Sequence, residues 1–282
     1  MVNSSHLIER INALRVAPGT LGLFGLGQVG LVIRGPEGSI YIDPYLTDND
    51  GEGGHLTRNF PAPLEPQTVT NADLVLISHD HVDHFDPLTL EPLSRASQQA
   101  HFVGPHTCDF GSLGISLERC TTPQALECFT ALGATITAIP SAHPDVAVTK
   151  RGHAFFGYVI EWNGLTIYHA GDTVIWPGQA STGLERGLIG VLERWVIDAA
   201  FLPINGRDYF RSARGLVGNM DHREAVELAQ ALNVRVIFPT HFDLFTANSV
   251  NPAHFVDYLY SRNPRRQHHL LHAGELYQLT RE

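Results

Sequence analysis

Histidine and aspartate side chains are concentrated in one short stretch of the sequence, Ser78–His84, which reads SHDHVDH. His79 and His81 are two residues apart, so an extended backbone directs both side chains to the same side. Asp83 and His84 are adjacent and diverge, so they can serve a second centre. Imidazole and carboxylate groups bind Zn²⁺, Mn²⁺ and Fe²⁺, whereas a merely solvated loop does not explain four candidate ligands within six positions. The stretch therefore predicts a metal site.

The stretch that begins at Ser78 directly follows the apolar run Asp73–Ile77, which predicts a buried strand. Sites of α/β proteins form at the carboxyl ends of strands, so this position suits a functional site.

Short apolar segments separated by glycine and proline turns predict the strands that position these residues. The predicted strands are Leu21–Leu26, Val29–Arg34, Ser39–Ile42, Asp73–Ile77, Ala100–Val103, Ala134–Ile139, Phe155–Glu161, Leu165–His169, Ala199–Pro203 and Val234–Pro239. The dipeptide Asn163-Gly164 predicts a hairpin turn between two of them. The residues His268–Leu279 predict a final hairpin.

Helical spacing of apolar residues appears in three places. The segment Asp221–Leu232 begins with a capping box formed by Asp221 and Glu224, and Pro252–Arg262 forms the last predicted helix. A further helix is expected after Asp86-Pro87, with Pro92 interrupting it. No linker-like stretch divides the chain, which predicts one domain, residues 1–282, with two sheets and helices packed outside them.

The composition of the 282 residues limits the classes of function. Hydrophobic residues make up 43% and charged residues 17%, which supports a packed core and excludes disorder. The 19 Lys and Arg residues against 29 Asp and Glu residues give a formal net charge of −10, which disfavours binding to nucleic acid. No apolar run is long enough to span a bilayer. Three cysteines and no secretion signal predict a cytoplasmic protein.

The segment Gly25–Gly30 fits the pattern G-x-G-x-x-G. That pattern binds a dinucleotide only where a helix begins at its third glycine. Here the strand-like residues Leu31-Val32-Ile33 follow, and the next acidic residue, Asp43, comes too early for a ribose contact. The segment therefore predicts a tight hairpin turn.

The stretch His79–His84 closely resembles the His-x-His-x-Asp-His motif of the metallo-β-lactamase superfamily. This superfamily expects further ligands downstream, each at the end of a strand. In that order the sequence has His143 after the predicted strand 134–139, Asp172 after 165–169 and His241 after 234–239, so the resemblance spans nearly the whole chain. It implies an α/β fold, a four-layer αββα sandwich in which two mostly antiparallel or mixed β-sheets are flanked by helices.

The resemblance also implies a dinuclear centre. It places His79, His81 and His143 on one cation and Asp83, His84 and His241 on the other, with Asp172 bridging. Two divalent transition-metal ions, Mn²⁺ or Zn²⁺ with Fe²⁺ as a further candidate, would share one hydroxide and generate a nucleophile at neutral pH. Asp83 and Asp172 are the expected catalytic residues, and Asp83 could orient the hydroxide or relay its proton.

Buried partners of the ligands are expected as well, because a ligating histidine usually donates its second ring N–H to a carboxylate or carbonyl. Asp43, at the end of a predicted strand, is a candidate for this role, and capping of its own turn is the alternative. His169 is expected to be a buried, hydrogen-bonded histidine and not a ligand. His222 faces either the mouth of the site or solvent at a helix start.

Several shorter stretches resemble the L-ascorbate-6-phosphate lactonase group of that superfamily. They include Val16–Thr20, Gly104–Cys108, Glu118–Cys120 and Tyr168–Asp172. The chain is shorter than those lactonases and carries His143 where they carry aspartate. The resemblance implies a metal-dependent lactonase or esterase that acts on a small anionic sugar-like substrate.

Basic residues supply candidates for binding such a substrate. The candidates are Arg58, Asn205, Arg207, Arg211 and Arg214. Three arginines within eight positions of an acidic protein suit a phosphate or carboxylate, and an ordinary solvated loop is the alternative for each of them. The glycine-rich residues 51–54 before Arg58 are a candidate flap over the metals.

Two other functions remain open from the sequence. The first is a metal-dependent phosphodiesterase that cleaves a small phosphodiester or a short nucleic acid. The second is a metal-dependent sensor or structural subunit without turnover. We expect a small-molecule substrate and neither long nucleic acid nor a membrane as partner, while association of identical chains is left open.

Overall fold

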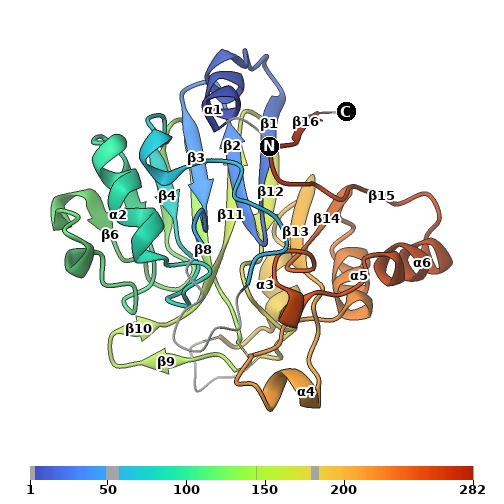
Figure 1. The fold of residues 1–282 in the computed structure, drawn as a ribbon. Coiled ribbons are helices and arrows are strands. Elements are labelled where there is room, and N and C mark those ends of the chain that lie inside the picture. Colours follow the sequence, from blue (N-terminus) through green and yellow to red (C-terminus); the bar gives the residue numbers. More distant parts are fainter. Residues whose placement is uncertain (1–3, 49–56, 144, 179–183, 282) are drawn as a thin grey trace.

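Two seven-stranded β-sheets lie face to face in this protein, and helices cover their outer faces (Figure 1). The structure, a computed structural model, describes residues 4–48, 57–143, 145–178 and 184–281. The predicted layered α/β sandwich is confirmed. No described helix combines the length and the apolar composition that a membrane span requires.

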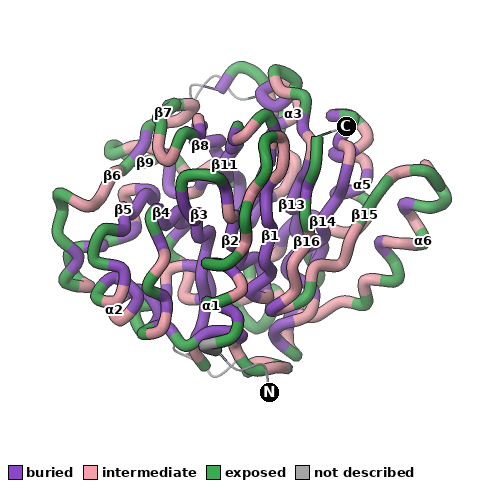
Figure 2. The backbone as a smooth tube through the Cα atoms, turned by 90° about the horizontal axis from the view of Figure 1, so that it is seen from above, coloured by how far each residue is buried: buried purple, intermediate pink, exposed green. Residues whose placement is uncertain are grey.

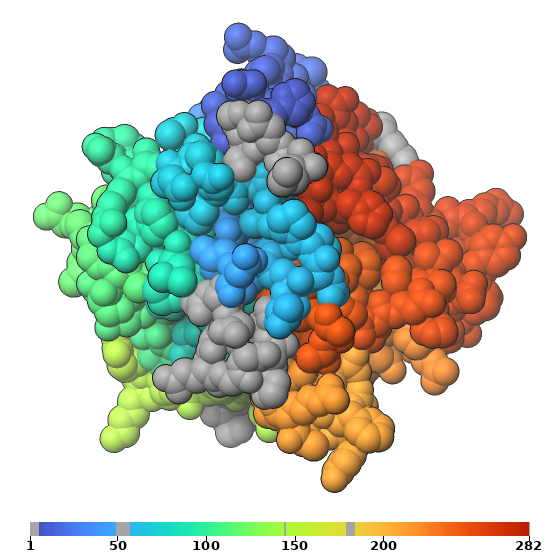
Figure 3. All heavy atoms as spheres, viewed as in Figure 1, coloured from blue at the N-terminus to red at the C-terminus, as the bar shows by residue number. Residues whose placement is uncertain are grey.

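The first sheet contains most of the N-terminal half of the chain and the last strand. In spatial order its strands are β16 (Leu276–Thr280), β1 (Thr20–Gly27), β2 (Gly30–Arg34), β3 (Ser39–Ile42), β4 (Leu74–Leu76), β5 (His101–Val103) and β6 (Cys120–Thr121). The pairs from β16 to β3 are antiparallel, and those from β3 to β6 are parallel. The N-terminal and C-terminal segments consequently lie against each other, blue beside red in Figure 3.

The second sheet has the same division into a parallel and an antiparallel half. In spatial order its strands are β15 (Gln267–His268), β14 (Val236–Thr240), β13 (Ala199–Pro203), β12 (Leu165–His169), β11 (Phe156–Trp162), β8 (Ala134–Pro140) and β7 (Cys128–Ala131). Pairing is parallel from β15 to β12 and antiparallel from β12 to β7. A separate two-stranded ribbon consists of β9 (Val148–Thr149) and β10 (Gly152–His153).

Successive side chains of a strand point to opposite faces of its sheet, so each strand contributes to two layers of the core. In β1, Leu23 packs between the two sheets and Phe24 packs under the helices of the first sheet. In β11, Tyr158 packs between the sheets and Val159 packs under the helices of the second sheet. The strands are therefore buried on both faces, as the purple centre of Figure 2 shows.

The helices divide between the two outer faces. They are α1 (Ser4–Ala13), α2 (Pro87–Ala96), α3 (Leu188–Leu192), α4 (Tyr209–Ser212), α5 (His222–Ala231) and α6 (Ala253–Arg262), with 3₁₀ turns η1 (Pro66–Thr68), η2 (Phe110–Leu113), η3 (Leu117–Arg119) and η5 (Thr246–Asn248). The helices α1 and α2 cover the first sheet, and α3, α5 and α6 cover the second. The short α4 lies at the lower edge in Figure 1, where Tyr209 and Phe210 are exposed.

Most predicted strands are present, with bounds that differ from the predicted ones by at most two residues. The predicted capping box of α5 is formed by Asp221 and Glu224. The predicted final hairpin is wrong, because β15 pairs with β14 in one sheet and β16 pairs with β1 in the other. The predicted interruption at Pro92 is also wrong. The helix α2 continues through Pro92, since Leu90 and Leu93 anchor it on the first sheet.

Candidate metal centre

The carboxyl ends of four strands deliver the seven predicted ligands to one edge of the two sheets. The loop after β4 carries His79, His81, Asp83 and His84, the loop after β8 carries His143, the loop after β12 carries Asp172, and His241 follows β14 directly. Since β8, β12 and β14 run in the same direction, their carboxyl ends lie at the same edge of the second sheet.

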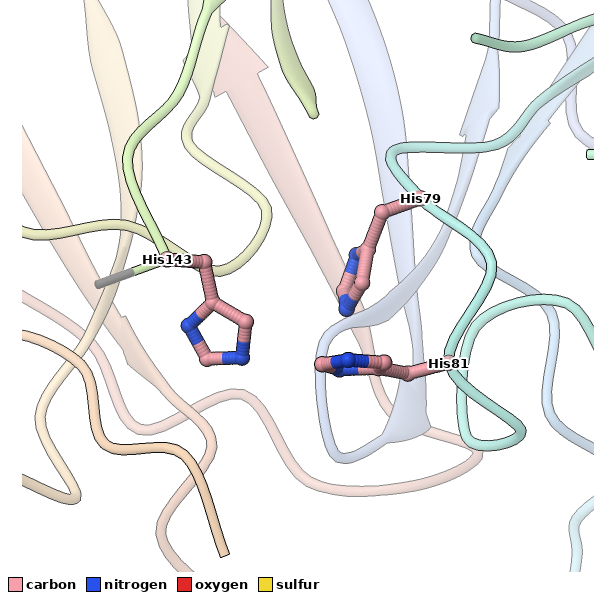
Figure 4. Close-up of side chains that lie close together, drawn as sticks. All are labelled: His79, His81 and His143. Carbon is pink, nitrogen blue, oxygen red and sulfur yellow. The ribbon is translucent and has the colours of Figure 1, made fainter. Parts of the chain in front are cut away.

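Three histidines form the first group of the centre. His79 and His81 come from the loop after β4, and His143 reaches toward them from the second sheet (Figure 4). The ring centroids of His79 and His143 are 5.4 Å apart, and those of His81 and His143 are 5.0 Å apart. The Phe155 ring lies within 6.1 Å of all three imidazoles and gives the group an aromatic wall.

The second group consists of Asp83, His84 and His241. Asp83 Oδ2 lies 3.7 Å from His84 Nε2 and 3.6 Å from His241 Nε2. Asp172 lies between the two groups, with Oδ2 3.6 Å from His143 Nε2 and 3.2 Å from His241 Nε2. The structure thus brings the seven predicted residues together, with Asp172 in contact with both groups.

Asp43 orients two of these histidines from the end of β3. It accepts hydrogen bonds from the Ser78 amide at 2.7 Å, the Ser78 hydroxyl at 2.6 Å and His84 Nδ1 at 2.9 Å. Because the single Ser78 hydroxyl proton goes to Asp43, Ser78 Oγ accepts from His79 Nδ1 at 3.0 Å. Both imidazoles are therefore held through Nδ1, and both turn Nε2 toward the centre.

The buried histidines of the centre have pKa values shifted in opposite directions. Burial lowers the pKa of His79 well below its usual value and that of His143 to about 4. Burial also acts to lower the pKa of His84, but the carboxylates of Asp83, Asp172 and Asp43 outweigh it and raise this pKa to about 10.

The carboxylates of the centre respond to the same charges. Burial by itself would raise the pKa of Asp83, but His84 and His241 outweigh it and hold this pKa below its usual value. Burial likewise opposes ionisation of Asp172, and His241 and His84 hold its pKa well below the usual value. Both side chains are therefore anionic at neutral pH and available to a cation.

Unpartnered polar atoms show that the residues fit metal ions. His79 Nε2, His84 Nε2 and Asp172 Oδ1 are buried without a hydrogen-bond partner. Leaving such atoms without a partner is costly, and a cation would satisfy them. Ligands about 2.1 Å from a tetrahedral cation lie about 3.4 Å apart, close to the separations found in the second group. Nitrogen and oxygen donors without thiolate suit Zn²⁺, Mn²⁺ or Fe²⁺.

Arg58, a predicted substrate-binding residue, is a buried side chain at 3% exposure. It donates hydrogen bonds to the carbonyls of Tyr45, Thr47 and Phe60 and lies over the Tyr45 ring. Its Nη2 has no hydrogen-bond partner. The candidate flap, residues 51–54, lies outside the described residues.

The other four predicted substrate-binding residues lie near the loop after β13. Asn205 is buried and bonded to Asn219 and Asn248, and Arg207 pairs with Glu224 of α5. Arg211 donates to Asn248 Oδ1, and Asn248 in turn lies 3.5 Å from His241 Nδ1. Arg214 is exposed. A role of these residues in substrate binding stays a prediction.

Two other histidines have structural contacts. His169 is buried, accepts from the Gly171 amide and donates from Nε2 to the Val29 carbonyl at 2.8 Å, as predicted for a histidine that is not a ligand. His222 lies beside the rings of His254 and Tyr258 on α6.

Gln28 is a residue of the centre that the sequence did not reveal. It lies in the turn between β1 and β2, where the G-x-G-x-x-G pattern indeed forms a hairpin. Its Nε2 is 2.8 Å from Asp83 Oδ2 and 3.0 Å from His241 Nε2. The turn signal predicts the hairpin but contains no information about which side chain reaches the other sheet.

Comparison with known proteins agrees with this geometry. Residues 39–242 match the family described as "Beta-lactamase superfamily domain". The chain is 25% identical to the "Probable L-ascorbate-6-phosphate lactonase UlaG" of Escherichia fergusonii over 287 aligned residues, which cover 88% of this chain and 77% of that protein.

Solved structures share the fold at lower identity. Igni18, described as a metallo hydrolase from the archaeon Ignicoccus hospitalis, has a TM-score of 0.68 at 22% identity, covering 93% of this chain and 100% of that chain. An isothiocyanate hydrolase from Delia radicum gut bacteria has a TM-score of 0.65 at 17% identity, covering 91% and 98%. With the family match over most of the chain, the protein belongs to the beta-lactamase superfamily, as a metal-dependent hydrolase of the metallo-β-lactamase fold.

Proposed function

We propose that this protein is a dinuclear metal-dependent hydrolase that opens a lactone or cleaves a related ester of a small anionic sugar-like molecule. The observation that carries the proposal is the overlap of the candidate ligand groups. His79, His84 and Asp172 form a group that links the one on His143 to the one on His241. Overlapping groups suit two cations that share a ligand, not two independent sites.

The residues of the centre then have distinct roles. Two cations bound by these residues would lower the pKa of a bound water towards about 7 and polarise a carbonyl oxygen. Asp172 holds both groups at a fixed separation. Asp83 has the more exposed side chain of the two carboxylates, 12% against 4%, which favours it as the group that orients the attacking water and takes its proton. Phe155 shields the first group from bulk water.

The relatives and the basic residues support the proposed substrate class. The name of the Escherichia fergusonii relative specifies a phosphorylated sugar-acid lactone, and this chain covers most of that protein. Arg211 pairs with Asp208 and donates to Asn248, which lies 3.5 Å from His241 Nδ1. The buried Arg58 retains an unpartnered N–H. Guanidinium groups in such positions suit the phosphate or carboxylate of a small substrate.

The test is a comparison of substrates with protein loaded with Mn²⁺, Zn²⁺ or Fe²⁺. We expect sugar lactones, the phosphorylated ones above all, to be hydrolysed faster than a chromogenic bis-phosphodiester. Absence of turnover on every lactone and ester would overturn the proposal. A much faster reaction on the phosphodiester would favour the phosphodiesterase that the sequence left open.

We propose in addition a cytoplasmic location and a small-molecule partner. The three cysteines are free thiols in the structure, and Cys128 is exposed, which suits a reducing compartment. The net charge of −10 opposes binding to long nucleic acids. Fractionation of cells that produce the protein would test the location.

A further inference from the structure

The turn between β1 and β2 brings one side chain of the first sheet into the candidate metal centre. Gln28 has a φ of +57° directly after Gly27 with a φ of +91°. Gln28 is 6% exposed although it lies at the tip of a hairpin, and exposure is the usual state of a glutamine in a turn. Its side-chain amide instead contacts Asp83 and His241, and these contacts offset the cost of burying it.

The contacts of Gln28 are with the second group. Its Nε2 lies 2.8 Å from Asp83 Oδ2, 3.0 Å from His241 Nε2 and 3.2 Å from His241 Nδ1. Asp83 Oδ2 is the oxygen that also faces His84 Nε2 at 3.7 Å. The Gln28 contacts are at hydrogen-bond distances, shorter than the about 3.4 Å between neighbouring ligands of a tetrahedral cation, and they place the end of the Gln28 amide beside two atoms that would hold the cation.

The backbone around Gln28 is fixed to the same elements. The amide of His241 donates to the Gln28 carbonyl at 3.0 Å, and His169 donates to the carbonyl of Val29 at 2.8 Å. These two bonds join the turn to the ends of β14 and β12. The side-chain amide can turn about its last torsion while the backbone stays in place, because this torsion has a broad, roughly two-fold preference.

We propose that Gln28 is a further ligand of the second cation, through its side-chain oxygen. In the structure the amide nitrogen donates to Asp83 Oδ2 and lies 3.0 Å from His241 Nε2. A cation held by these two atoms would repel the N–H end of the amide dipole and attract its oxygen end. A half-turn of the amide then exchanges Nε2 for Oε1 and presents a neutral oxygen ligand beside Asp83 and His241. The inference rests on the dinuclear centre proposed above.

The test measures binding of each cation to the wild type and to three variants. Gln28→Met keeps the size of the side chain without its oxygen, Gln28→Glu keeps an oxygen without the N–H donor, and Gln67→Met makes the same change on an exposed side chain away from the centre. Calorimetric titration with Zn²⁺ and elemental analysis would give the affinities. Urea unfolding of the metal-free variants would show that each is folded.

We expect Gln28→Met to weaken binding of the second cation by about 10- to 100-fold with the first unchanged. Gln28→Glu should bind at least as tightly as the wild type, and Gln67→Met should not differ from it. Substitution of Co²⁺ adds a spectroscopic measurement, since its visible absorption depends on coordination number and should change in Gln28→Met.

The inference would be overturned by wild-type affinity in Gln28→Met, or by an equal loss of both cations. It would also be overturned if Gln28→Glu were as weak as Gln28→Met, because the N–H donor would then be the essential group. A wild type that binds a single cation overturns it as well. Two bound cations without turnover on any ester or lactone would instead defeat the proposed function and leave the role of Gln28 standing.

Discussion

The carboxylate of Asp172 lies at the point where the candidate ligands meet. Its two oxygens are within 3.6 Å of His84, His143 and His241 nitrogens. The preceding Gly171 has a φ of +58°, and a Cβ there would lie 2.7 Å from the Cβ of Ser78. Only glycine fits this close turn, so the backbone itself sets the position of the carboxylate.

Replacement of Asp172 by asparagine should therefore affect both cations. The Asp172→Asn variant keeps the shape of the side chain but removes the negative charge that both groups share. We expect the affinity for each cation to fall by about 100-fold or more, and hydrolysis with it. Metal content after gel filtration and turnover in excess Mn²⁺ would measure the two effects. Full occupancy by both cations in Asp172→Asn would contradict the bridging role.

Asp43 offers a milder change, because it contacts His84 and Ser78 and is not itself one of the candidate ligands. In Asp43→Asn, the contacts that hold His84 and Ser78 lose their charge. We expect metal affinity to weaken by about 10- to 100-fold while the fold is kept. Competition with a chromogenic chelator would measure the affinity. Asp198→Asn, which alters an ion pair with Arg235 at the other end of the strands, is the matched control and should bind metal normally.

At the scale of elements, a strand could be predicted where the pattern of apolar and turn residues within its own segment is enough to define it. Leu165–His169 and Ala199–Pro203 are found with the predicted bounds, because continuous apolar runs between turn residues match strands buried on both faces. The ligand set came from the resemblance to the metallo-β-lactamase superfamily, which implied His143, Asp172 and His241. The predicted strands agreed with it, because each of these residues comes one to three positions after a strand.

Elements that depend on distant partners were not predictable in this way. The residues of β15 and β16 have the pattern of a hairpin, yet each strand pairs with a strand far away in the sequence. Gln28 is a similar case, because its significance depends on Asp83, 55 positions away. Nothing in a Gly-Gln turn indicates which side chain on the opposite sheet it will meet.

The helix α5 is the element whose start is best specified by the sequence. Asp221 accepts from the amides of Arg223 and Glu224, and Glu224 accepts from the Asp221 amide. Asp221→Ala should lower the free energy of unfolding by about 1 kcal/mol, measured in urea, with both cations still bound. Arg223→Ala, an exposed change in the same turn, should have little effect. Loss of metal in Asp221→Ala alone would mean that the helix start takes part in the centre.

At the scale of the whole molecule, folding brings acidic and basic side chains of the two sheets together in one buried centre. Each sheet contributes ligands from the carboxyl ends of its strands, and folding buries these groups together. In the absence of cations, His84 and His241 have raised pKa values, whereas His79 and His143 have lowered ones. The stability of the metal-free protein therefore depends on pH in both directions around the usual histidine pKa.

Above pH 6.5, the raised pKa values of His84 and His241 determine how the stability of the metal-free protein changes with pH. A histidine whose pKa is higher in the folded state contributes stability that is complete below pH 6.5. This contribution is lost as the pH rises through the folded value, about 10 for His84. Each such group changes the free energy of unfolding by up to about 1.4 kcal/mol per pH unit. We expect metal-free protein in chelator to be less stable to urea at pH 8.5 than at pH 6.5. The fall should be shallower in Asp43→Asn, where His84 loses one carboxylate partner.

Below pH 6.5, the lowered pKa values of His79 and His143 give the opposite dependence of stability on pH. They stay neutral in the folded state below pH 6.5, while the unfolded chain takes up their protons, so stability falls again as the pH drops toward 4. The metal-free protein should thus be most stable near pH 6.5. Saturating Zn²⁺ should abolish the alkaline fall, because the cation replaces the proton on His84 and binds more tightly as the pH rises. Urea unfolding at closely spaced pH values, with and without Zn²⁺, would measure both limbs. A metal-free protein whose stability rises steadily from pH 6.5 to 8.5 would show that these histidines are not paired with carboxylates as the structure has them.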